Sequence, residues 1–259
     1  MLIKEFIEKF EERFPKSLQE SWDNSGLQIG NVNEELKGIL TCVDLTEEVI
    51  EEASKVGANL IICHHPILFR STNSIDFDYF ISRKIIKAIK KDLVVYASHT
   101  AIDVNKNGLN TFVFKEMGFR PFAKLVPLED GHGYGDITDT PSRKVSHFAD
   151  QIKERLNIDH VVFYGDEDAE VSKIALVTGA GDSFINECVD LGIELYITSD
   201  FKHHEAMDAL EQGVMVMDIG HYESEKLFNN LVAKISKEIW LDGRIFSESK
   251  VDRYRRNII

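Results

Sequence analysis

The chain has few cysteines and no long apolar run, and each of these two shortages excludes a class of protein. Its 259 residues include three cysteines and five prolines. Cys42, Cys63 and Cys188 are far apart and form no C-x-x-C pair, which argues against a disulfide framework or a thiolate zinc site and fits a reducing compartment. We expect them to be buried as small apolar side chains. No apolar segment approaches the ~20 residues needed to cross a bilayer, so we expect no membrane span.

Positive charge is also scarce. Lysine and arginine number 30 against 44 acidic residues, a net charge of −14 with histidine neutral. This balance excludes a general nucleic-acid binder, although it allows a local pocket for a small anion. Charged residues interrupt the first apolar stretch, so we find no signal-peptide layout and expect a cytoplasmic protein. We interpret a basic tail as a solvated end: Lys250, Arg253, Arg255 and Arg256.

The hydrophobic pattern alternates between strands and helices, after an opening helix that ends before Pro15. We expect strands at 39–43, 59–63, 93–97, 172–178, 193–198 and 214–218. We expect helices at 46–56, 79–91, 142–156, 182–191, 202–212 and 221–237. Alternation at these lengths predicts parallel βαβ units, hence the α/β class. The glycine- and proline-rich stretch at 120–170 indicates entry into a second domain.

The two βαβ units align without gaps when one is shifted by 135 residues. Ile39 then meets Ile174, and Gly57 meets Gly192. One hypothesis is that the two halves share one architecture by duplication. The alternative is that any two βαβ units show such apolar matches.

A histidine pair follows one apolar strand directly, in NLIICHHP at 59–66. Ligands of parallel α/β sheets bind outside the carboxyl ends of strands, where His64 and His65 are expected. Adjacent side chains on an extended segment point apart, so two neighbouring metal ions would suit them better than one. The alternative is a pair of histidines hydrogen-bonded to the backbone.

Two further segments place histidines and carboxylates at predicted strand ends. His99 and Asp103 lie four residues apart in ASHTAIDVN, and His221 and Glu225 lie four apart in DIGHYESE. Asp103 alone is more often a turn or capping residue, and any helix can carry His-x-x-x-Glu. Together with His64 and His65 they favour a metal site of imidazole and carboxylate ligands, which suits iron, zinc or manganese.

A glycine-rich loop, TGAGDS at 178–183, follows another predicted strand. It is not a dinucleotide fingerprint, because Phe184 stands where a third glycine would be needed. The loop could present backbone N–H groups to an anion, or it could be a structural turn.

Five ordered segments resemble the motifs of the Nif-three-like family, whose members are often named GTP cyclohydrolase I type 2 homologues. They are SWDNSGLQIG, ICHHPILF, ASHTAIDVN, SDFKHHEAMDALEQG and DIGHYESE. The resemblance covers residues 1–255. It implies two related α/β domains, the second inserted into the first, with a dinuclear metal centre at the carboxyl ends of strands. We place the metal-binding domain at 1–124 plus 214–259 and the inserted domain at 125–213.

The resemblance also implies which residues form the site. Family metal-binding positions correspond to His64, His65, Asp103, His221 and Glu225, with Glu225 bridging two divalent ions. Positions near the site correspond to Trp22, Asp23, His99 and His204. The family commonly assembles as a homohexamer, a trimer of dimers.

Two functions from different classes are compatible with this site. The first is a dinuclear-metal hydrolase acting on a purine nucleotide such as GTP or on another anionic substrate, with a metal-activated water as nucleophile and His99 or His204 as general acid or base. The second is non-catalytic: metal storage, delivery or insertion, or an adaptor role. Five ligands for two ions, with Glu225 counted twice, leave vacant positions, which favours chemistry or metal exchange over a purely structural site.

Overall fold

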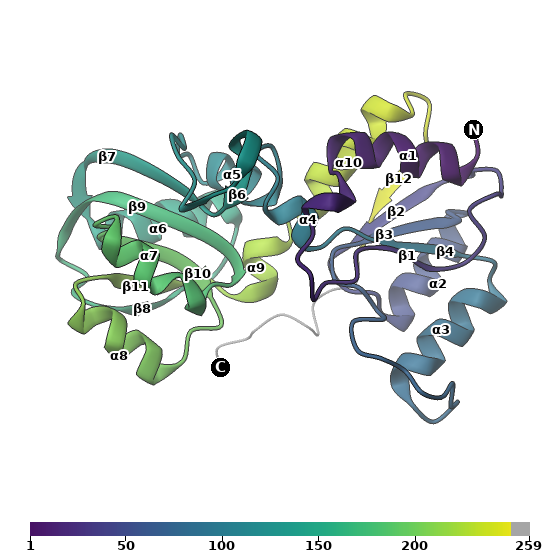
Figure 1. Ribbon diagram of the computed structural model, residues 1–259, viewed down its shortest axis with the longest axis horizontal. Helices are drawn as coiled ribbons and strands as arrows, with labels where there is room; N and C mark the ends of the chain where they lie inside the picture. The colour runs from purple at the N-terminus through teal and green to yellow at the C-terminus, as the bar shows by residue number, and fades with distance from the viewer. Residues whose placement is uncertain (250–259) are drawn as a thin grey trace. The chain divides into compact units, whose positions relative to one another are not determined.

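The chain divides into two compact units in the computed structural model (Figure 1), which describes residues 1–249. Among the described residues, the first unit comprises Met1–Ile102 and 228–249, and the second comprises Asp103–Leu227. The basic tail of the sequence, with the rest of 250–259, lies outside the described residues. Each unit is described by itself.

The first unit is built around a five-stranded sheet in the order β1-β4-β3-β2-β12. β2, β3, β4 and β12 are parallel to one another, and β1 lies antiparallel to β4 at one edge. The central strands β2, β3 and β4 are buried at every position, as expected for parallel strands covered on both faces. The bounds are β1 (Gly26–Ile29), β2 (Ile39–Cys42), β3 (Leu60–Cys63), β4 (Val94–Ala97) and β12 (Ile245–Ser247).

Helices cover both faces of this sheet (Figure 1): α2 and α3 one face, α1 and α10 the other. Thr46 caps α2 by accepting a hydrogen bond from the backbone N–H of Val49, and Gly57 ends it with φ +73°. The bounds are α1 (Ile3–Arg13), α2 (Glu47–Val56), α3 (Phe80–Lys90) and α10 (Phe228–Ile239). A short 3-10 turn at Lys16–Leu18 follows α1, and α4 (Thr100–Asp103) ends at the division between the units.

The second unit contains a five-stranded sheet in the order β7-β9-β10-β11-β8. β9, β10 and β11 are parallel, with antiparallel strands at both edges. The strands are β7 (Asp136–Lys144), β8 (Val162–Tyr164), β9 (Glu170–Ala180), β10 (Leu195–Ser199) and β11 (Met215–Asp218). A small pair, β5 (Val126–Pro127) and β6 (Gly133–Tyr134), precedes them. The parallel centre confirms the α/β class.

Five helices accompany the second sheet. Apolar side chains of α7 and α8 form one cluster with Ala175, Val177 and Val216 of the sheet. Phe114 of α5 and Phe148 of α6 pack against Phe119 in a separate set of rings. The bounds are α5 (Leu109–Glu116), α6 (Val145–Leu156), α7 (Ile185–Asp190), α8 (His203–Glu211) and α9 (His221–Glu225).

The two parallel pairs that the 135-residue shift aligns have the same register. Ile39 of β2 faces Leu60 of β3, and Ile174 of β9 faces Leu195 of β10. Gly57 and Gly192 both adopt positive φ, of +73° and +62°. The shared register supports a common βαβ architecture, and duplication stays a hypothesis about its origin.

The expected strands and helices are present, but three features differ. The helix expected at 221–237 is broken into α9 and α10, and the edge strands β1, β7, β8 and β12 carry no clear sequence pattern. The second unit spans Asp103–Leu227 instead of 125–213. It is larger because β11 pairs with β10 in the second sheet, and because α5 packs against β9 and β7.

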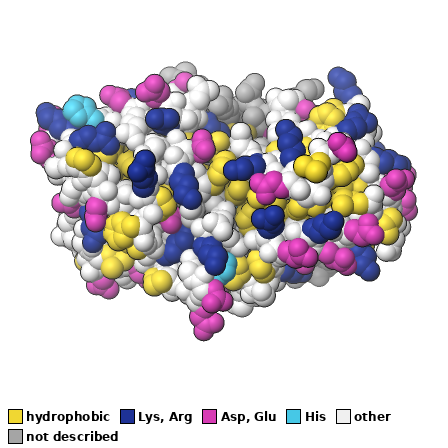
Figure 2. Space-filling model, turned by 90° about the horizontal axis from the view of Figure 1, so that it is seen from above, with side chains coloured by type: hydrophobic (Ala, Val, Ile, Leu, Met, Phe, Trp, Pro, Cys, Tyr) yellow, Lys and Arg dark blue, Asp and Glu magenta, His cyan; other side chains and the backbone are white. Residues whose placement is uncertain are grey.

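The cysteines and the helices can be compared with what the composition predicts. Cys42, Cys63 and Cys188 are free and buried, as expected. Among residues 1–249, none of the helices is both long and apolar enough to cross a membrane. In the view of Figure 2, basic side chains are interspersed with acidic and apolar ones.

We predict that each central strand is essential to its own unit. Leu60→Ala in β3 and Leu195→Ala in β10 remove the same group from fully buried positions. Each should lower the free energy of unfolding by about 2–5 kcal/mol in urea titrations. Leu241→Ala, at a side chain that is 86% exposed, is the control and should change it by less than about 0.5 kcal/mol. Equal effects at Leu60 and Leu241 would contradict the assigned core.

Candidate metal centre

Two neighbouring parallel strands bring three histidines to one edge of the first sheet. Cys63 of β3 is in register with Ala97 of β4, and both strands end there. His64 and His65 follow β3, and His99 follows β4 after Ser98. The ring Nδ1 of His64 lies 2.9 Å from the backbone oxygen of Ser98, which ties the two strand ends together.

These three imidazoles form a compact group. Their ring centroids are 5.0 Å apart for His64 and His65, 5.3 Å for His64 and His99, and 5.5 Å for His65 and His99. One nitrogen from each ring lies within 4.8 Å of the others, so the group could hold a metal ion. His64 is fully buried, and the side chains of His65 and His99 are 26% and 17% exposed. His64 therefore forms the buried side of the group, and solvent reaches the group at His65 and His99.

The Nδ1 atom of each of the four site histidines lies within hydrogen-bond distance of an oxygen acceptor. The partner of His65 is Asp44 at 2.9 Å, that of His99 is Asp23 at 2.9 Å, and that of His221 is Asp200 at 2.7 Å, while His64 has the Ser98 carbonyl. Carbonyl and carboxylate oxygens only accept, so the proton sits on Nδ1 and the Nε2 lone pair becomes the ligand. This carboxylate or carbonyl support is characteristic of metal-ligating histidines.

The same aspartate–histidine arrangement occurs once in each unit. Asp44 follows β2 and its partner His65 follows the adjacent parallel strand β3. Asp200 follows β10 and its partner His221 follows the adjacent parallel strand β11. Both pairs are separated by 21 residues in sequence. An aspartate at one strand end thus orients a histidine at the next, once in each sheet.

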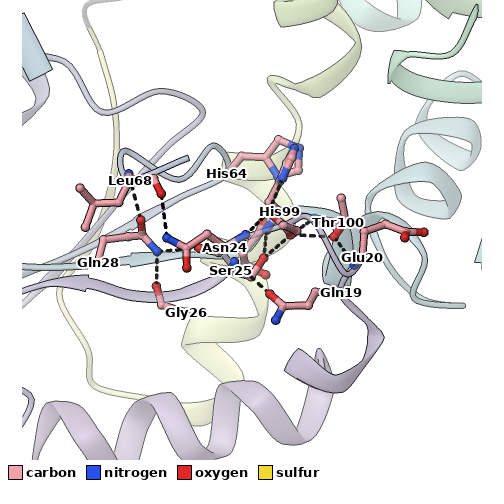
Figure 3. Close-up of polar contacts among 12 residues, drawn as sticks. Gln19, Glu20, Asn24, Ser25, Gly26, Gln28, His64, Leu68, His99 and Thr100 are labelled. Carbon is pink, nitrogen blue, oxygen red and sulfur yellow. Dashed lines mark hydrogen bonds and ion pairs between the residues drawn. The ribbon is translucent and has the colours of Figure 1, made fainter. Parts of the chain in front are cut away.

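Asp23 is the centre of a polar network that holds the loop before β1. Figure 3 labels its partners His99, Thr100 and Ser25. Its side chain is fully buried and accepts hydrogen bonds from His99 Nδ1, from the Thr100 hydroxyl at 2.6 Å and from the Ser25 hydroxyl at 2.8 Å. Burial alone raises the pKa of the Asp23 carboxyl, but these hydrogen bonds outweigh burial and hold the pKa well below its ordinary value. Asp23 is therefore ionised at neutral pH and fixes the orientation of His99.

In the second unit, His221 and Glu225 form a pair on one face of α9. His221 Nε2 lies 3.2 Å from Glu225 Oε2, and its Nδ1 faces Asp200. A neutral imidazole has one N–H and cannot donate to both carboxylates. The arrangement is satisfied when the ring is protonated or when a cation lies between Nε2 and the Glu225 carboxylate. Since the Glu225 side chain is only 5% exposed, a divalent ion would also compensate its buried charge.

The end of β9 supports this pair at close range. The Gly179 N–H donates to Ser224 Oγ at 2.9 Å, and Ser224 Oγ donates to the His221 carbonyl. A Cβ placed on Gly179 would lie 2.5 Å from Glu225 Oε1, so only glycine leaves room for that carboxylate. The glycine loop of the sequence is thus a structural element at Gly179, whose N–H is engaged by Ser224 instead of being presented to an anion.

The remaining sequence candidates lie at defined positions in the second unit. Asp103 ends α4, and its carbonyl accepts a hydrogen bond from the Asn110 amide at 3.0 Å. His204 is exposed in the first turn of α8, with its ring centroid 5.3 Å from that of His203. Asp44 and Asp200 are not among the residues predicted from the sequence, although each follows the end of a predicted strand. Asp200 has φ +59°, a conformation that aspartate tolerates better than most residues.

These features define an α/β protein with histidine and carboxylate groups that could bind a metal. The family model of Duf34/NIF3 (NGG1p interacting factor 3) matches residues 1–248. The chain therefore belongs to the Duf34/NIF3 family, as its motifs predict.

Individual relatives agree over nearly the whole chain. A "GTP cyclohydrolase 1 type 2 homolog" of Clostridium perfringens is 36% identical over 228 residues, 87% of each chain. One of Streptococcus pneumoniae is 30% identical over 251 residues, 95% of this chain and 94% of the relative. The crystal structure of a hypothetical protein of Staphylococcus aureus has a TM-score of 0.94 at 28% identity, covering 100% of this chain and 99% of that chain.

We predict that Asp200 supports metal binding through His221. Asp200→Ala removes the acceptor of the Nδ1 proton and should weaken Zn²⁺ binding by about 10- to 100-fold in competition with a chromogenic chelator. Asp208→Ala, an exposed aspartate of α8, is the matched control and should leave the affinity unchanged. Equal affinities of the Asp200 variant and the native protein would contradict the assigned support.

We also predict that Gly179→Ala displaces the Glu225 carboxylate. Gly192→Ala is the matched control, because Gly192 has a similar φ, +62° against +69°, and nothing within 4 Å of its Cβ position. Both variants should lose about 1–2 kcal/mol of stability from the left-handed backbone. Only Gly179→Ala should also lose metal affinity. The same metal affinity in both variants would show that the close approach at Gly179 has no bearing on the site.

Proposed function

We propose that His64, His65, Asp103, His221 and Glu225 together hold two divalent ions of iron, zinc or manganese, with Glu225 bridging them. Imidazole nitrogen and carboxylate oxygen are donors that suit these metals. The observation that carries the proposal is the shared orientation of the histidines, whose Nδ1 atoms all face carbonyl or carboxylate acceptors. Membership of the family whose motif positions these residues match is the second support.

We propose hydrolysis of a purine nucleotide as the activity. The relatives' name, GTP cyclohydrolase 1 type 2 homolog, supports this substrate class. When bound, two such ions would lower the pKa of water and stabilise negative charge that develops on the substrate. The chain itself would orient the ions, exclude water on the buried His64 side, and supply a proton-transfer group.

His99 is our first candidate for the proton-transfer group. Its Nδ1 proton is held by the ionised Asp23, so its Nε2 lone pair can accept a proton and return it, and Asp23 stabilises the imidazolium in between. His204, exposed at the start of α8, is the second candidate, with no acceptor of this kind recorded for its ring among the described residues. The structure therefore favours His99 over His204.

The second candidate function is metal handling without catalysis. It is favoured by the exposure of these side chains. Asp44 and Asp200, which orient the ligands, are each 55% exposed, and the ligand His221 is 35% exposed. Such groups are accessible to a metal acceptor as well as to a substrate. Rapid transfer of the bound metal to an apo-acceptor, with no turnover of any nucleotide, would favour this function.

We further propose a cytoplasmic homo-oligomer, in the hexameric arrangement that the family resemblance implies. Three free cysteines fit a reducing compartment. Large exposed apolar side chains in the first unit, Ile75, Phe77, Phe80 and Ile89, are typical of surfaces that become covered in an assembly. The mass of the native particle tests the hexamer.

We predict that His99→Ala separates catalysis from metal binding. The metal-loaded variant should keep its metal content but lose about 100-fold or more in the rate of GTP ring opening, measured by the loss of purine absorbance and a mass gain of one water. His132→Ala, outside the three-histidine group, serves as control.

Three outcomes would change this account. Loss of metal from the His99 variant would make His99 a ligand. Phosphate release instead of ring opening would change the bond that is hydrolysed. Absence of any nucleotide turnover by the fully loaded native protein would favour the metal-handling function.

A further inference from the structure

An exposed aromatic pair stands next to the three-histidine group. The side chains of Trp22 and Phe69 are 58% and 49% exposed. Their ring centroids are 5.9 Å apart, and each lies 6.0 Å from the centroid of His99. The three rings are steeply inclined to one another, with interplanar angles of 72° to 83°. Two large apolar rings are thus left facing solvent beside the candidate centre.

The loops that carry these rings are tightly held (Figure 3). Next to Trp22, Asp23 is fixed by His99, Thr100 and Ser25. Next to Phe69, the Leu68 carbonyl accepts from the Asn24 amide at 2.8 Å, and the Leu68 N–H donates to Gln28 Oε1 at 3.2 Å. The two loops are therefore joined by hydrogen bonds between side chains of one loop and the backbone of the other, which hold the chain on either side of the exposed rings.

We propose that Trp22 and Phe69 form a stacking site for the planar heterocyclic base of a nucleotide. Because the two rings are nearly perpendicular, a flat ring that stacks on one meets the other with its edge, and both are favourable aromatic geometries. Stacking would place the base next to His99. The proposal rests on the nucleotide hydrolase function, and it adds the residues that recognise the base.

Other exposed aromatics of the first unit are placed differently. Phe77 and Phe80 are 64% and 52% exposed, but their rings face the ammonium groups of Lys90 and Lys84 at 5.5 and 5.7 Å. Trp22 and Phe69 contact the histidine group instead. This position separates a ligand-binding role for the pair from the general exposure of apolar side chains. Phe122 of the second unit, which is 62% exposed, is a suitable control.

The test is isothermal titration of metal-loaded protein with GTP, guanosine and tripolyphosphate. Base stacking predicts that Trp22→Ala and Phe69→Ala weaken GTP and guanosine binding by about tenfold or more, because each aromatic–base contact contributes substantially. Trp22→Phe should restore most of the affinity, and Phe122→Ala should leave it unchanged. Tripolyphosphate, which has no base, should bind all variants equally.

The outcomes separate this proposal from the hydrolase function. Binding of GTP that depends on Trp22 without any turnover supports the stacking site and contradicts the hydrolase. Three results overturn the stacking site: no binding of GTP or guanosine by the native protein, equal losses for GTP and tripolyphosphate, or unchanged GTP affinity in Trp22→Ala. A change of particle mass in Trp22→Ala with unchanged GTP affinity would assign the pair to a subunit interface.

Discussion

The hydrogen bond from each imidazole Nδ1 to a fixed oxygen is the interaction on which the site depends. A histidine side chain rotates about two bonds and has two possible ligand atoms. Once a carboxylate or carbonyl oxygen accepts the Nδ1 proton, the ring orientation is fixed. Nε2 then carries the lone pair that can bind a metal ion. His64, His65, His99 and His221 all show this support. Their orientation therefore belongs to the folded chain and does not have to be created by a bound ion.

The parallel sheets explain how the chain provides these oxygens. Adjacent parallel strands end at the same edge, so a residue after one strand is a neighbour of a residue after the next. Asp44 and His65 meet in this way in the first unit, and Asp200 and His221 meet in the second. Asp23 differs, because it precedes the antiparallel edge strand β1, and its buried carboxylate joins the loop of Trp22 to the start of α4. One buried anion thus holds both the His99 ring and the loop that carries Trp22.

The sequence predicted the periodic parts of the fold well. Apolar runs of four or five residues, separated by amphipathic helices, identified β2, β3, β4, β9, β10 and β11, and the fold class follows from them. The edge strands were missed because a half-exposed strand such as β7 has little apolar alternation. The domain limits were displaced because the pattern shows that β11 is a strand but not which sheet it joins. Strand partners are a tertiary property that local sequence does not encode.

The candidate ligands can be predicted from the sequence, but the residues that orient them cannot. The spacing of His221 and Glu225 places both on one helix face, and the structure has their side chains 3.2 Å apart. Asp44 and Asp200 could not be chosen from the sequence, because each lies 21 residues from its partner and acts only once the strand order is known. The sequence predicts only a turn or an anion loop at Gly179, because the fold alone brings the Glu225 carboxylate close to this residue.

The most direct test of the account is the metal content per chain, measured by elemental mass spectrometry on untagged protein. Glu225→Ala is the informative variant. Its control is Glu211→Ala, which removes an acidic side chain from α8. The account predicts about two ions in the native protein and in the control, and a sharp fall in Glu225→Ala with the fold intact. Little or no metal in the native protein, or an unchanged content in Glu225→Ala, would contradict a centre bridged by Glu225.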